Sequence, residues 1–180
     1  GDGELLRLFQ QDGDGFARWE AGQTLATGLI LRAIAAGGKG EAVAPDPEFV
    51  AAFGRVLADP KADKSLLALM LTLPSEPYLG EQMATIDVDA IHLAREAFRR
   101  ALAKAHRDLL LAVYRAASAN DPASRDPVAA GRRALRNLAL GYLVALGDGE
   151  ALSLCARQAR EGQTMTEVQG ALAALCETDA

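Results

Sequence analysis

The sequence has few aromatic residues, few histidines and cysteines, and no excess of basic charge. Aromatic residues make up 5% of its 180 residues, and β-branched residues are few, which disfavours a sheet protein. The formal net charge is −5, whereas nucleic-acid-binding proteins usually carry an excess of basic charge. No apolar run approaches the roughly 20 residues that span a bilayer, and the acidic start Gly1-Asp2-Gly3-Glu4 is unlike a signal peptide. We therefore expect neither a nucleic-acid partner nor a membrane partner.

Histidine and cysteine are too scarce for the common metal and thiol chemistries. Cys155 and Cys176 lie in apolar helical patterns, so we expect buried reduced thiols, with a disulfide bridge as the alternative. His92 and His106 would be about 21 Å apart along one helix and could not share a metal. No H-E-x-x-H motif occurs, and His92 with Glu96 is interpreted as a surface pair one helical turn apart. We therefore predict no metal site and no cofactor in this chain.

Motifs for nucleophilic catalysis and phosphate binding are also missing. Ser153 has no histidine near it in sequence, and no G-x-S-x-G elbow occurs. The stretch Gly37-Gly-Lys-Gly40 lacks the first glycine of a P-loop and its Ser or Thr after lysine. Gly147-Asp-Gly-Glu150 has too few carboxylates for a calcium loop. No catalytic residue is predicted.

Alanine and leucine are abundant, and both favour helix. Hydrophobic residues make up 50% of the chain, enough for one domain with a core. The seven prolines separate long stretches that are free to be helical. The predicted helices cover residues 4–11, 16–37, 47–58, 63–73, 76–83, 88–118, 127–147, 150–160 and 165–177.

Capping signals mark several of these helix starts. Asp46-Pro47 and Asp126-Pro127 each place an acidic cap before a proline at the first helical position. Ser75 and Asp87 are further candidate caps, and Thr164-Met-Thr-Glu167 matches a capping box.

The one tryptophan, Trp19, lies on an apolar stripe at the spacing of one helix face. The stripe consists of Phe16, Trp19, Gln23, Ala26 and Ile30. We predict Trp19 in the core rather than as a ligand platform, and expect Trp19→Ala to cost on the order of 3–5 kcal/mol. Other residues predicted to be buried are Phe49, Phe53, Val56, Leu57, Leu66, Leu67, Leu69, Met70, Leu71, Ile91, Phe98, Leu102, Leu109, Val113 and Cys176. The last helix is predicted to run through Leu172 and Leu175.

Short connections between consecutive helices favour antiparallel packing, and stacked helix pairs build superhelical solenoids. The predicted fold is all-α: an α-solenoid of antiparallel helix pairs, armadillo- or HEAT-like, in a single domain at 1–180. No exact repeat of 34 or 40 residues occurs, so the repeat is structural. The last predicted helix ends without a polar capping repeat, which indicates a truncated solenoid.

The basic cluster of Arg132, Arg133 and Arg136 is the one candidate functional site. These positions share a helix face, and positions 95, 99 and 100 carry a second arginine set. Guanidinium forks bind carboxylates well. A solvated or salt-bridged face is the commoner role of such a cluster. The alternative is that some of these arginines line a channel or contact a neighbouring domain.

Several phrases resemble the C-terminal helical domain of aminopeptidase N, the bacterial alanyl aminopeptidase family of zinc metallopeptidases. They are Phe16-Ala-Arg-Trp-Glu-Ala-Gly-Gln23, Leu73-Pro-Ser-Glu-Pro-Tyr78, Thr85-Ile-Asp-Val-Asp-Ala-Ile-His-Leu-Ala-Arg-Glu96, Arg132-Arg-Ala-Leu-Arg-Asn137 and Met165-Thr-Glu167. The resemblance implies a cytoplasmic parent protein of four domains: a β-rich N-terminal domain, a thermolysin-like catalytic domain, a small β-sandwich and a C-terminal helical domain. It implies that this chain is the first part of the helical domain. It also implies a zinc site and a G-A-M-E-N motif that this chain lacks.

The resemblance further implies that the parent removes N-terminal residues from peptides through a zinc-activated water. This segment is then non-catalytic, is inactive alone, and helps to wall and gate access to the active site. Its partners are the other domains of the parent chain and the peptide substrates. Two alternatives are a free-standing helical adapter for a protein partner and a helical carrier of a small apolar ligand.

Overall fold

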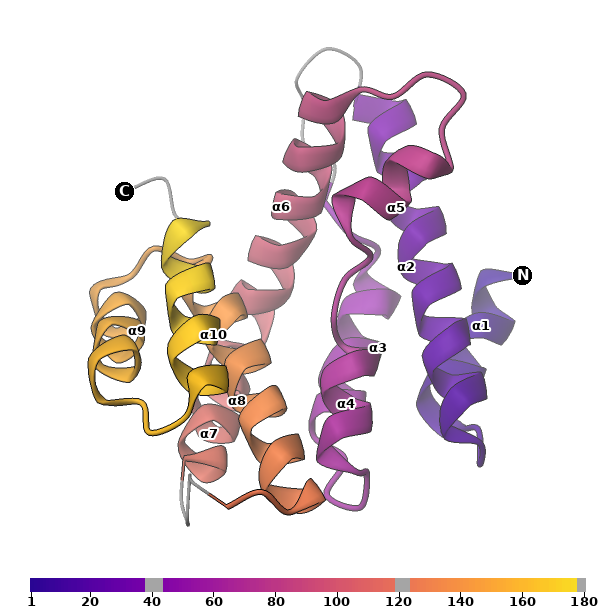
Figure 1. The fold of residues 1–180 in the computed structure, drawn as a ribbon. Helices are drawn as coiled ribbons and strands as arrows, with labels where there is room; N and C mark the ends of the chain where they lie inside the picture. Colours follow the sequence, from indigo (N-terminus) through magenta and orange to yellow (C-terminus); the bar gives the residue numbers. More distant parts are fainter. Residues whose placement is uncertain (38–43, 119–123, 178–180) are drawn as a thin grey trace. The chain divides into compact units, whose positions relative to one another are not determined.

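A computed structural model describes residues 1–37, 44–118 and 124–177, which form ten helices and no strand (Figure 1). None of the helices in these ranges has the length and apolar character that crossing a membrane requires. The all-α prediction is confirmed. The helices are α1 (Asp2–Gln11), α2 (Gly15–Gly37), α3 (Pro47–Leu57), α4 (Lys64–Met70), α5 (Glu76–Glu81), α6 (Val88–Ala105), α7 (Arg107–Ala117), α8 (Pro127–Val144), α9 (Gly149–Glu161) and α10 (Met165–Cys176).

Local capping signals account for most of the helix starts. The side chains of Asp46, Ser75 and Asp126 each accept a hydrogen bond from a backbone amide in the first turn of the helix that follows. Thr164 and Glu167 form the reciprocal hydrogen bonds of a capping box at the start of α10. These predicted caps are confirmed. The predicted connection at 41–46 lies partly outside the described residues.

The predicted long helix at 88–118 is wrong, because two helices, α6 and α7, meet at His106. The backbone of His106 has φ −122° and ψ 23°, which interrupts the helix without a proline or glycine. Leu109 and Val113, predicted for the core, are half-buried, whereas Leu110 is fully buried. Moving the apolar face by one residue turns it by about 100°. The buried face of α7 accordingly runs through Leu110, Leu111 and Tyr114.

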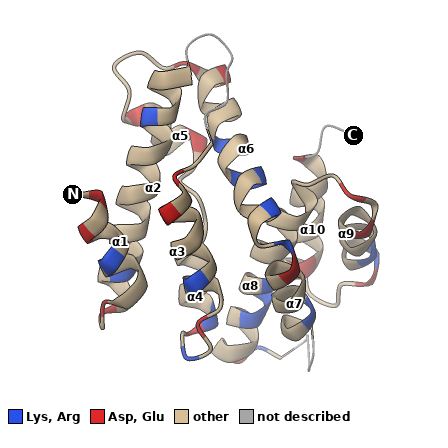
Figure 2. Ribbon diagram, turned by 180° about the vertical axis from the view of Figure 1, so that it is seen from behind, with Lys and Arg blue, Asp and Glu red and all other residues tan. Residues whose placement is uncertain are grey.

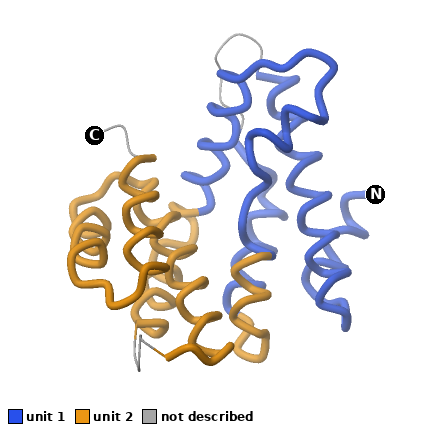
Figure 3. Tube along the Cα trace, in the orientation of Figure 1, with its two compact units in different colours: residues 1–58, 70–102 blue, residues 59–69, 103–180 orange. Residues whose placement is uncertain are grey.

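The helices belong to two compact units, which Figure 3 shows in different colours. Unit 1 comprises Gly1–Ala58 and Met70–Leu102, and unit 2 comprises Asp59–Leu69 and Ala103–Ala180. One boundary lies between α3 and α4, and the other two fall within α4 and α6.

In unit 1, α1 packs against α2 and α3 around the buried ring of Phe9. A Cβ built on Gly22 of α2 would lie 2.7 Å from Cδ2 of Phe9, so the missing side chain lets the ring approach the backbone of α2. Phe9 stacks on Phe49 with ring centroids 6.5 Å apart, and Phe49 lies at the same distance from Phe98. The core of unit 1 also contains Leu25, Ile30, Phe53, Val56, Leu57, Leu71, Leu79, Ile91 and Leu102.

The prediction that Trp19 lies in the core is wrong. Trp19 is half-buried, and its stripe neighbour Phe16 is 66% exposed. The two rings contact each other instead, with centroids 5.6 Å apart. Farther along α2, the predicted positions Ala26 and Ile30 are buried. Periodicity placed Ala26 and Ile30 correctly, but nearer the start of α2 the buried face runs through Ala21, Gly22 and Leu25 and not through Trp19.

In unit 2, α8 packs against α7, α9 and α10, and α9 packs against α10. Cys155 is buried as predicted; its Sγ donates to the backbone oxygen of Ala171 at 3.2 Å, and burial raises the pKa of this thiol to about 11. Cys176 is a free, exposed thiol, so its predicted burial is wrong, and Leu172 of the same helix is 50% exposed. The small residues Ala171 and Ala174 form the buried face of α10, because close helix packing favours the side of α10 with the least bulk.

On α4 the predicted burial is confirmed at Leu67 and Met70 but wrong at Leu69, which is 61% exposed. A helix of two turns with apolar residues in succession cannot cover all of its sides.

Two glycines of α8 provide a matched stability test. A Cβ on Gly131 would lie 2.7 Å from Oγ and 2.9 Å from the backbone N of Ser65, whereas within the described residues a Cβ on Gly141 would meet no atom within 4 Å. We expect Gly131→Ala to lower the free energy of unfolding by about 1–3 kcal/mol, because the backbone near Ser65 must move. Gly141→Ala should raise it by about 0.5–1 kcal/mol, because alanine favours helix. Urea midpoints of the two variants should thus move in opposite directions; a stabilised Gly131→Ala would contradict the close approach.

Candidate contact site on helix α8

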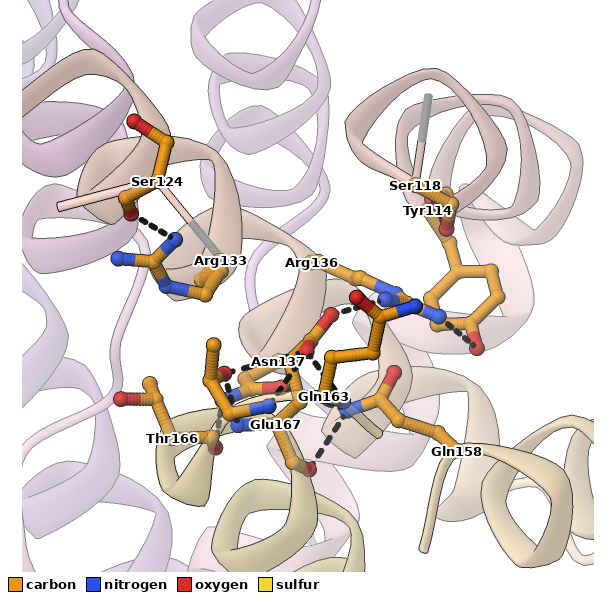
Figure 4. A network of polar contacts seen from close by, with 11 residues as sticks. Tyr114, Ser118, Ser124, Arg133, Arg136, Asn137, Gln158, Gln163, Thr166 and Glu167 are labelled. Atoms are coloured by element: carbon orange, nitrogen blue, oxygen red, sulfur yellow. Dashed lines mark hydrogen bonds and ion pairs between the residues drawn. The ribbon is translucent and has the colours of Figure 1, made fainter. Parts of the chain in front are cut away.

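The three predicted arginines of α8 have different surroundings. Arg133 is half-buried and donates from Nη1 to the backbone oxygen of Ser124 at 2.8 Å (Figure 4). Arg132 is half-buried near the N-terminus of α8, where its charge helps to lower the pKa of the capping residue Asp126, although hydrogen bonds from Ala129 and Ser124 lower it more. Arg136 points into unit 2 and has partners on two other helices.

Arg136 forms an ion pair with Glu167, the capping-box residue of α10 (Figure 4). The Glu167 side chain is 2% exposed and the Arg136 side chain is 17% exposed. Nη2 of Arg136 donates to the hydroxyl of Tyr114 at 3.3 Å, and the guanidinium lies 5.0 Å from the centre of the same ring. This geometry combines a cation–π contact with a charge-assisted hydrogen bond. One arginine therefore joins α7, α8 and α10.

Glu167 receives enough hydrogen bonds to remain stable as a buried carboxylate. Besides Arg136, its donors are the backbone amides of Gln163 and Thr164, both at 3.2 Å, and the Thr164 hydroxyl at 3.1 Å. A buried charge is tolerated only when it is paired and hydrogen-bonded. Glu167 meets both conditions, and it also satisfies backbone donors just before α10.

Two amide side chains extend the polar network to α9. Nε2 of Gln158 donates to Oδ1 of Asn137 at 2.8 Å and to the backbone oxygen of Glu167 at 2.9 Å. Nδ2 of Asn137 in turn donates to the backbone oxygen of Thr166 at 2.8 Å. A Cβ on Gly170 would lie 2.3 Å from Nδ2 of Asn137, so this glycine leaves the space that the amide occupies.

Two members of this network, Arg136 and Glu167, were singled out from the sequence, but the ion pair between them was not predicted. Arg136 belonged to the candidate cluster, and Glu167 was predicted as a capping residue. Their pairing joins positions 31 residues apart, which no local pattern reveals. Tyr114 and Gln158 were not singled out at all, because a single residue on a helix face gives no signal of a polar partner.

A second charge cluster ties the start of α7 to the start of α9. Nε of Arg107 donates to Oδ2 of Asp148 at 3.0 Å, and its Nη2 donates to Glu150 at 2.8 Å. Arg115 also contacts Glu150, at 3.1 Å. The pKa of Asp148 lies below its ordinary value because the Ala151 amide, and next the Arg107 guanidinium, donate hydrogen bonds to its carboxylate. The same carboxylates raise the pKa of Arg107.

Asp148 should make the stability of unit 2 sensitive to acid. A lowered pKa means that its contribution is present above the ordinary value of 3.8 and is lost as the pH falls through the folded-state pKa. At neutral pH, Asp148→Ala should cost about 0.5–2 kcal/mol through loss of the α9 cap. Asp148→Asn keeps a capping oxygen and loses the ion pair, so about 0–1 kcal/mol is expected. Urea unfolding at neutral pH and below pH 3.8 tests this prediction. The loss of free energy of unfolding caused by Asp148→Ala should be smaller in acid. A loss that does not change with pH would contradict a stabilising role of the Asp148 carboxylate.

The second arginine set, on α6, also has internal partners. Figure 2 shows basic positions spaced along this helix. Nε of Arg95 donates to the backbone oxygen of Pro74 at 2.9 Å, and Arg99, only 7% exposed, pairs with Glu96 at 2.9 Å. His92 contacts Glu76 through Nδ1 at 2.9 Å, so its predicted pairing with Glu96 is wrong. Glu76 belongs to the short helix α5, which sequence spacing along α6 could not reveal.

The side chains that could bind a metal are dispersed. Within residues 1–37, 44–118 and 124–177, no three His, Cys, Asp or Glu side chains come together in a group that could hold an ion. The ion pairs of Glu96, Asp148 and Glu167 engage these carboxylates with arginines. The described residues therefore do not fit a zinc ion.

Comparison with known proteins matches the chain to one family over nearly its whole length. The family model is described as Domain of unknown function (DUF3458_C) ARM repeats, and it matches residues 2–180. Aminopeptidase N of Caulobacter vibrioides is 40% identical over 165 residues, which are 92% of this chain and 19% of that protein. Aminopeptidase N of Escherichia coli is 34% identical over 175 residues, 96% of this chain and 20% of that protein.

A solved structure supports the same relationship. The crystal structure of Legionella pneumophila aminopeptidase A in complex with aspartic acid superposes with a TM-score of 0.83 at 26% identity. The match covers 98% of this chain and 21% of that chain. The resemblance to aminopeptidase N is thus confirmed, and the ARM-repeat description agrees with the predicted α-solenoid. The chain spans about a fifth of the length of the relatives that it matches.

Proposed function

The chain belongs to the family described as Domain of unknown function (DUF3458_C) ARM repeats, and on that premise we propose that it is a non-catalytic helical domain of a zinc-dependent aminopeptidase. The parent enzyme removes N-terminal residues from peptides in the cytoplasm. This domain helps to wall the active site and to gate access to it. The observation that carries the proposal is the match to aminopeptidase N over 92% of this chain and only 19% of that relative.

The chemistry of the chain supports a scaffold role. The described residues do not fit zinc, so the metal and the residues that activate water belong to the other domains of the parent. Arg136 is engaged with Glu167 inside unit 2 and positions α10. Of the three arginines, we assign the contact role to Arg132 and Arg133 at the start of α8, where Arg133 also donates to the backbone oxygen of Ser124. The ion pair of Arg136 with Glu167 and the contact of Arg136 with Tyr114 link α7, α8 and α10 into such a scaffold.

A comparison of substrates of different length tests gating in the intact parent enzyme. Arg132→Ala together with Arg133→Ala should change kcat/KM for long peptides by about tenfold, equal to 1.4 kcal/mol, and leave turnover of a short alanyl chromogenic substrate nearly unchanged. Arg125→Ala, at an exposed position of the same unit, serves as the control. Equal effects on long and short substrates would contradict gating.

The isolated chain tests the non-catalytic role. Purified and supplemented with zinc, it should not hydrolyse an alanyl chromogenic substrate. Turnover that copurifies with the chain through successive columns, and that a chelator removes, would overturn the assignment.

One apolar cavity among the described residues bears on the carrier alternative. The apolar cavity between Phe9, Phe49 and Phe53 of unit 1 measures about 10 Å³, which is the space of about one water molecule. A small apolar ligand does not fit there.

A further inference from the structure

A polar pocket of about 140 Å³ lies in unit 2 beside the Arg136–Glu167 pair. The side chains of Ser118, Arg136, Arg157, Gln158, Glu161 and Glu167 contribute to its lining. Two arginines and two glutamates give this lining a balanced formal charge. An occupant with one positive and one negative group therefore suits the pocket better than a single ion of either sign.

Two buried polar atoms of residues that line this pocket have no hydrogen-bond partner among the described residues: Nε of Arg136 and Oε1 of Gln158. Both atoms are closed to a water-sized molecule in this structure, so an occupant reaches them only when neighbouring side chains shift. Gln158 is only 2% exposed. Its Nε2 already donates to two oxygens, of Asn137 and of the Glu167 backbone, so turning the amide over would place oxygen against oxygen. The orientation of Gln158 is thus fixed, and Figure 4 shows its Oε1 directed toward the side where Arg136 and Gln163 lie.

An unsatisfied buried donor or acceptor costs about 1–3 kcal/mol. An occupant with complementary groups would therefore stabilise Nε of Arg136 and Oε1 of Gln158. That occupant must accept a hydrogen bond from Arg136 and donate one to Gln158. A single water needs only about 10–15 Å³, whereas a cavity of about 150 Å³ holds a molecule of benzene size. The volume of this pocket thus suits about six non-hydrogen atoms.

We propose that this pocket binds a small free α-amino acid, such as glycine or alanine, in its zwitterionic form. The carboxylate accepts from Nε of Arg136, and the ammonium group donates to Oε1 of Gln158. Both ligand groups remain charged, and no covalent step is involved. Binding at this pocket depends on its lining and its two unpaired atoms and does not depend on the proposed function.

Nuclear magnetic resonance of the ¹⁵N-labelled 180-residue chain tests the proposal. Glycine should shift the signals of the Gln158 side-chain amide, the Arg136 Nε–H and the backbone amide of Gly162, with a dissociation constant on the order of 1 mM. Acetate and methylammonium, which each carry only one of the two charged groups, should bind at least about tenfold more weakly, a difference of 1.4 kcal/mol. Equal shifts with acetate or methylammonium would overturn the zwitterion assignment.

A matched pair of variants locates the site. Gln158→Leu should weaken glycine binding about tenfold or more, whereas Gln169→Leu, the same change at an exposed position of α10, should not affect it. If Gln158→Leu fails to fold, nuclear Overhauser effects between the alanine methyl group and Gly162 in the unaltered chain decide. Absence of those effects, or unchanged binding by folded Gln158→Leu, means that the pocket holds water only and overturns the proposal.

Discussion

Replacing Glu167 by alanine is expected to lower the free energy of unfolding by about 3–5 kcal/mol, because it leaves a largely buried guanidinium without its counter-charge. Arg136 has no carboxylate other than Glu167 among its ion pairs in the described residues. The backbone amides of Gln163 and Thr164 lose an acceptor at the same time. Since a buried donor left unpaired costs more than a typical hydrogen bond contributes, the losses act in the same direction.

Urea unfolding followed by circular dichroism measures this effect, and two variants calibrate it. Glu161→Ala removes an exposed carboxylate close to the same pocket and should stay within about 0.5 kcal/mol of the unaltered chain. Replacing both partners, with Arg136→Met and Glu167→Leu, should recover most of the loss, because apolar pairs often match buried ion pairs in stability. If Glu167→Ala costs no more than Glu161→Ala, the pair does not hold unit 2 together.

The helices could be predicted from sequence because their signals are local. Asp46, Asp126 and the Thr164–Glu167 capping box each act within one helical turn, and proline cannot continue a helix from within. The break at His106 has no such signal. It depends on which faces of α6 and α7 are covered, and the apolar stripe alone was compatible with a continuous helix through Leu109 and Val113.

The candidate site could be predicted only in part, for a related reason. Arg132, Arg133 and Arg136 share a helix, and spacing indicated that they form a basic group. Which of them points inward depends on residues of other helices: Tyr114 of α7 and Glu167 of α10 select Arg136. A carboxylate in a capping box and an arginine in a charge run each have an ordinary surface interpretation. Their pairing becomes visible only when the fold brings positions 31 residues apart together.

The core errors have one physical cause. Periodicity shows which residues share a helix face, but not how far along the helix that face is covered. Phe16 is exposed and Trp19 is half-buried near the start of α2, and Leu172 and Cys176 lie on the exposed side of α10. In both helices the buried side includes small residues, such as Ala21 on α2 and Ala171 on α10, because small side chains allow the closest approach of neighbouring helices.

Phe9→Ala should destabilise the chain far more than Trp19→Ala, the substitution for which the sequence alone predicted a large cost. Phe9 is 1% exposed and stacks on Phe49, so its truncation should cost about 3–5 kcal/mol. Trp19 is half-buried and contacts the exposed ring of Phe16. Losing that contact should cost about 0.5–1.5 kcal/mol. Because Trp19 is the only tryptophan, unfolding is followed by circular dichroism and not by fluorescence.

The contact between Phe9 and Gly22 allows a sharper test by a double-mutant cycle. In the unaltered chain, Gly22→Ala places a Cβ 2.7 Å from the ring of Phe9 and should be destabilising by about 1–3 kcal/mol. With Phe9→Ala the ring is gone, and the same substitution should instead stabilise α2 by about 0.5–1 kcal/mol through the helix preference of alanine. The coupling energy between the two sites is the difference between these effects and should therefore be about 1.5–4 kcal/mol. If Gly22→Ala has the same effect in both backgrounds, the ring of Phe9 does not lie against α2.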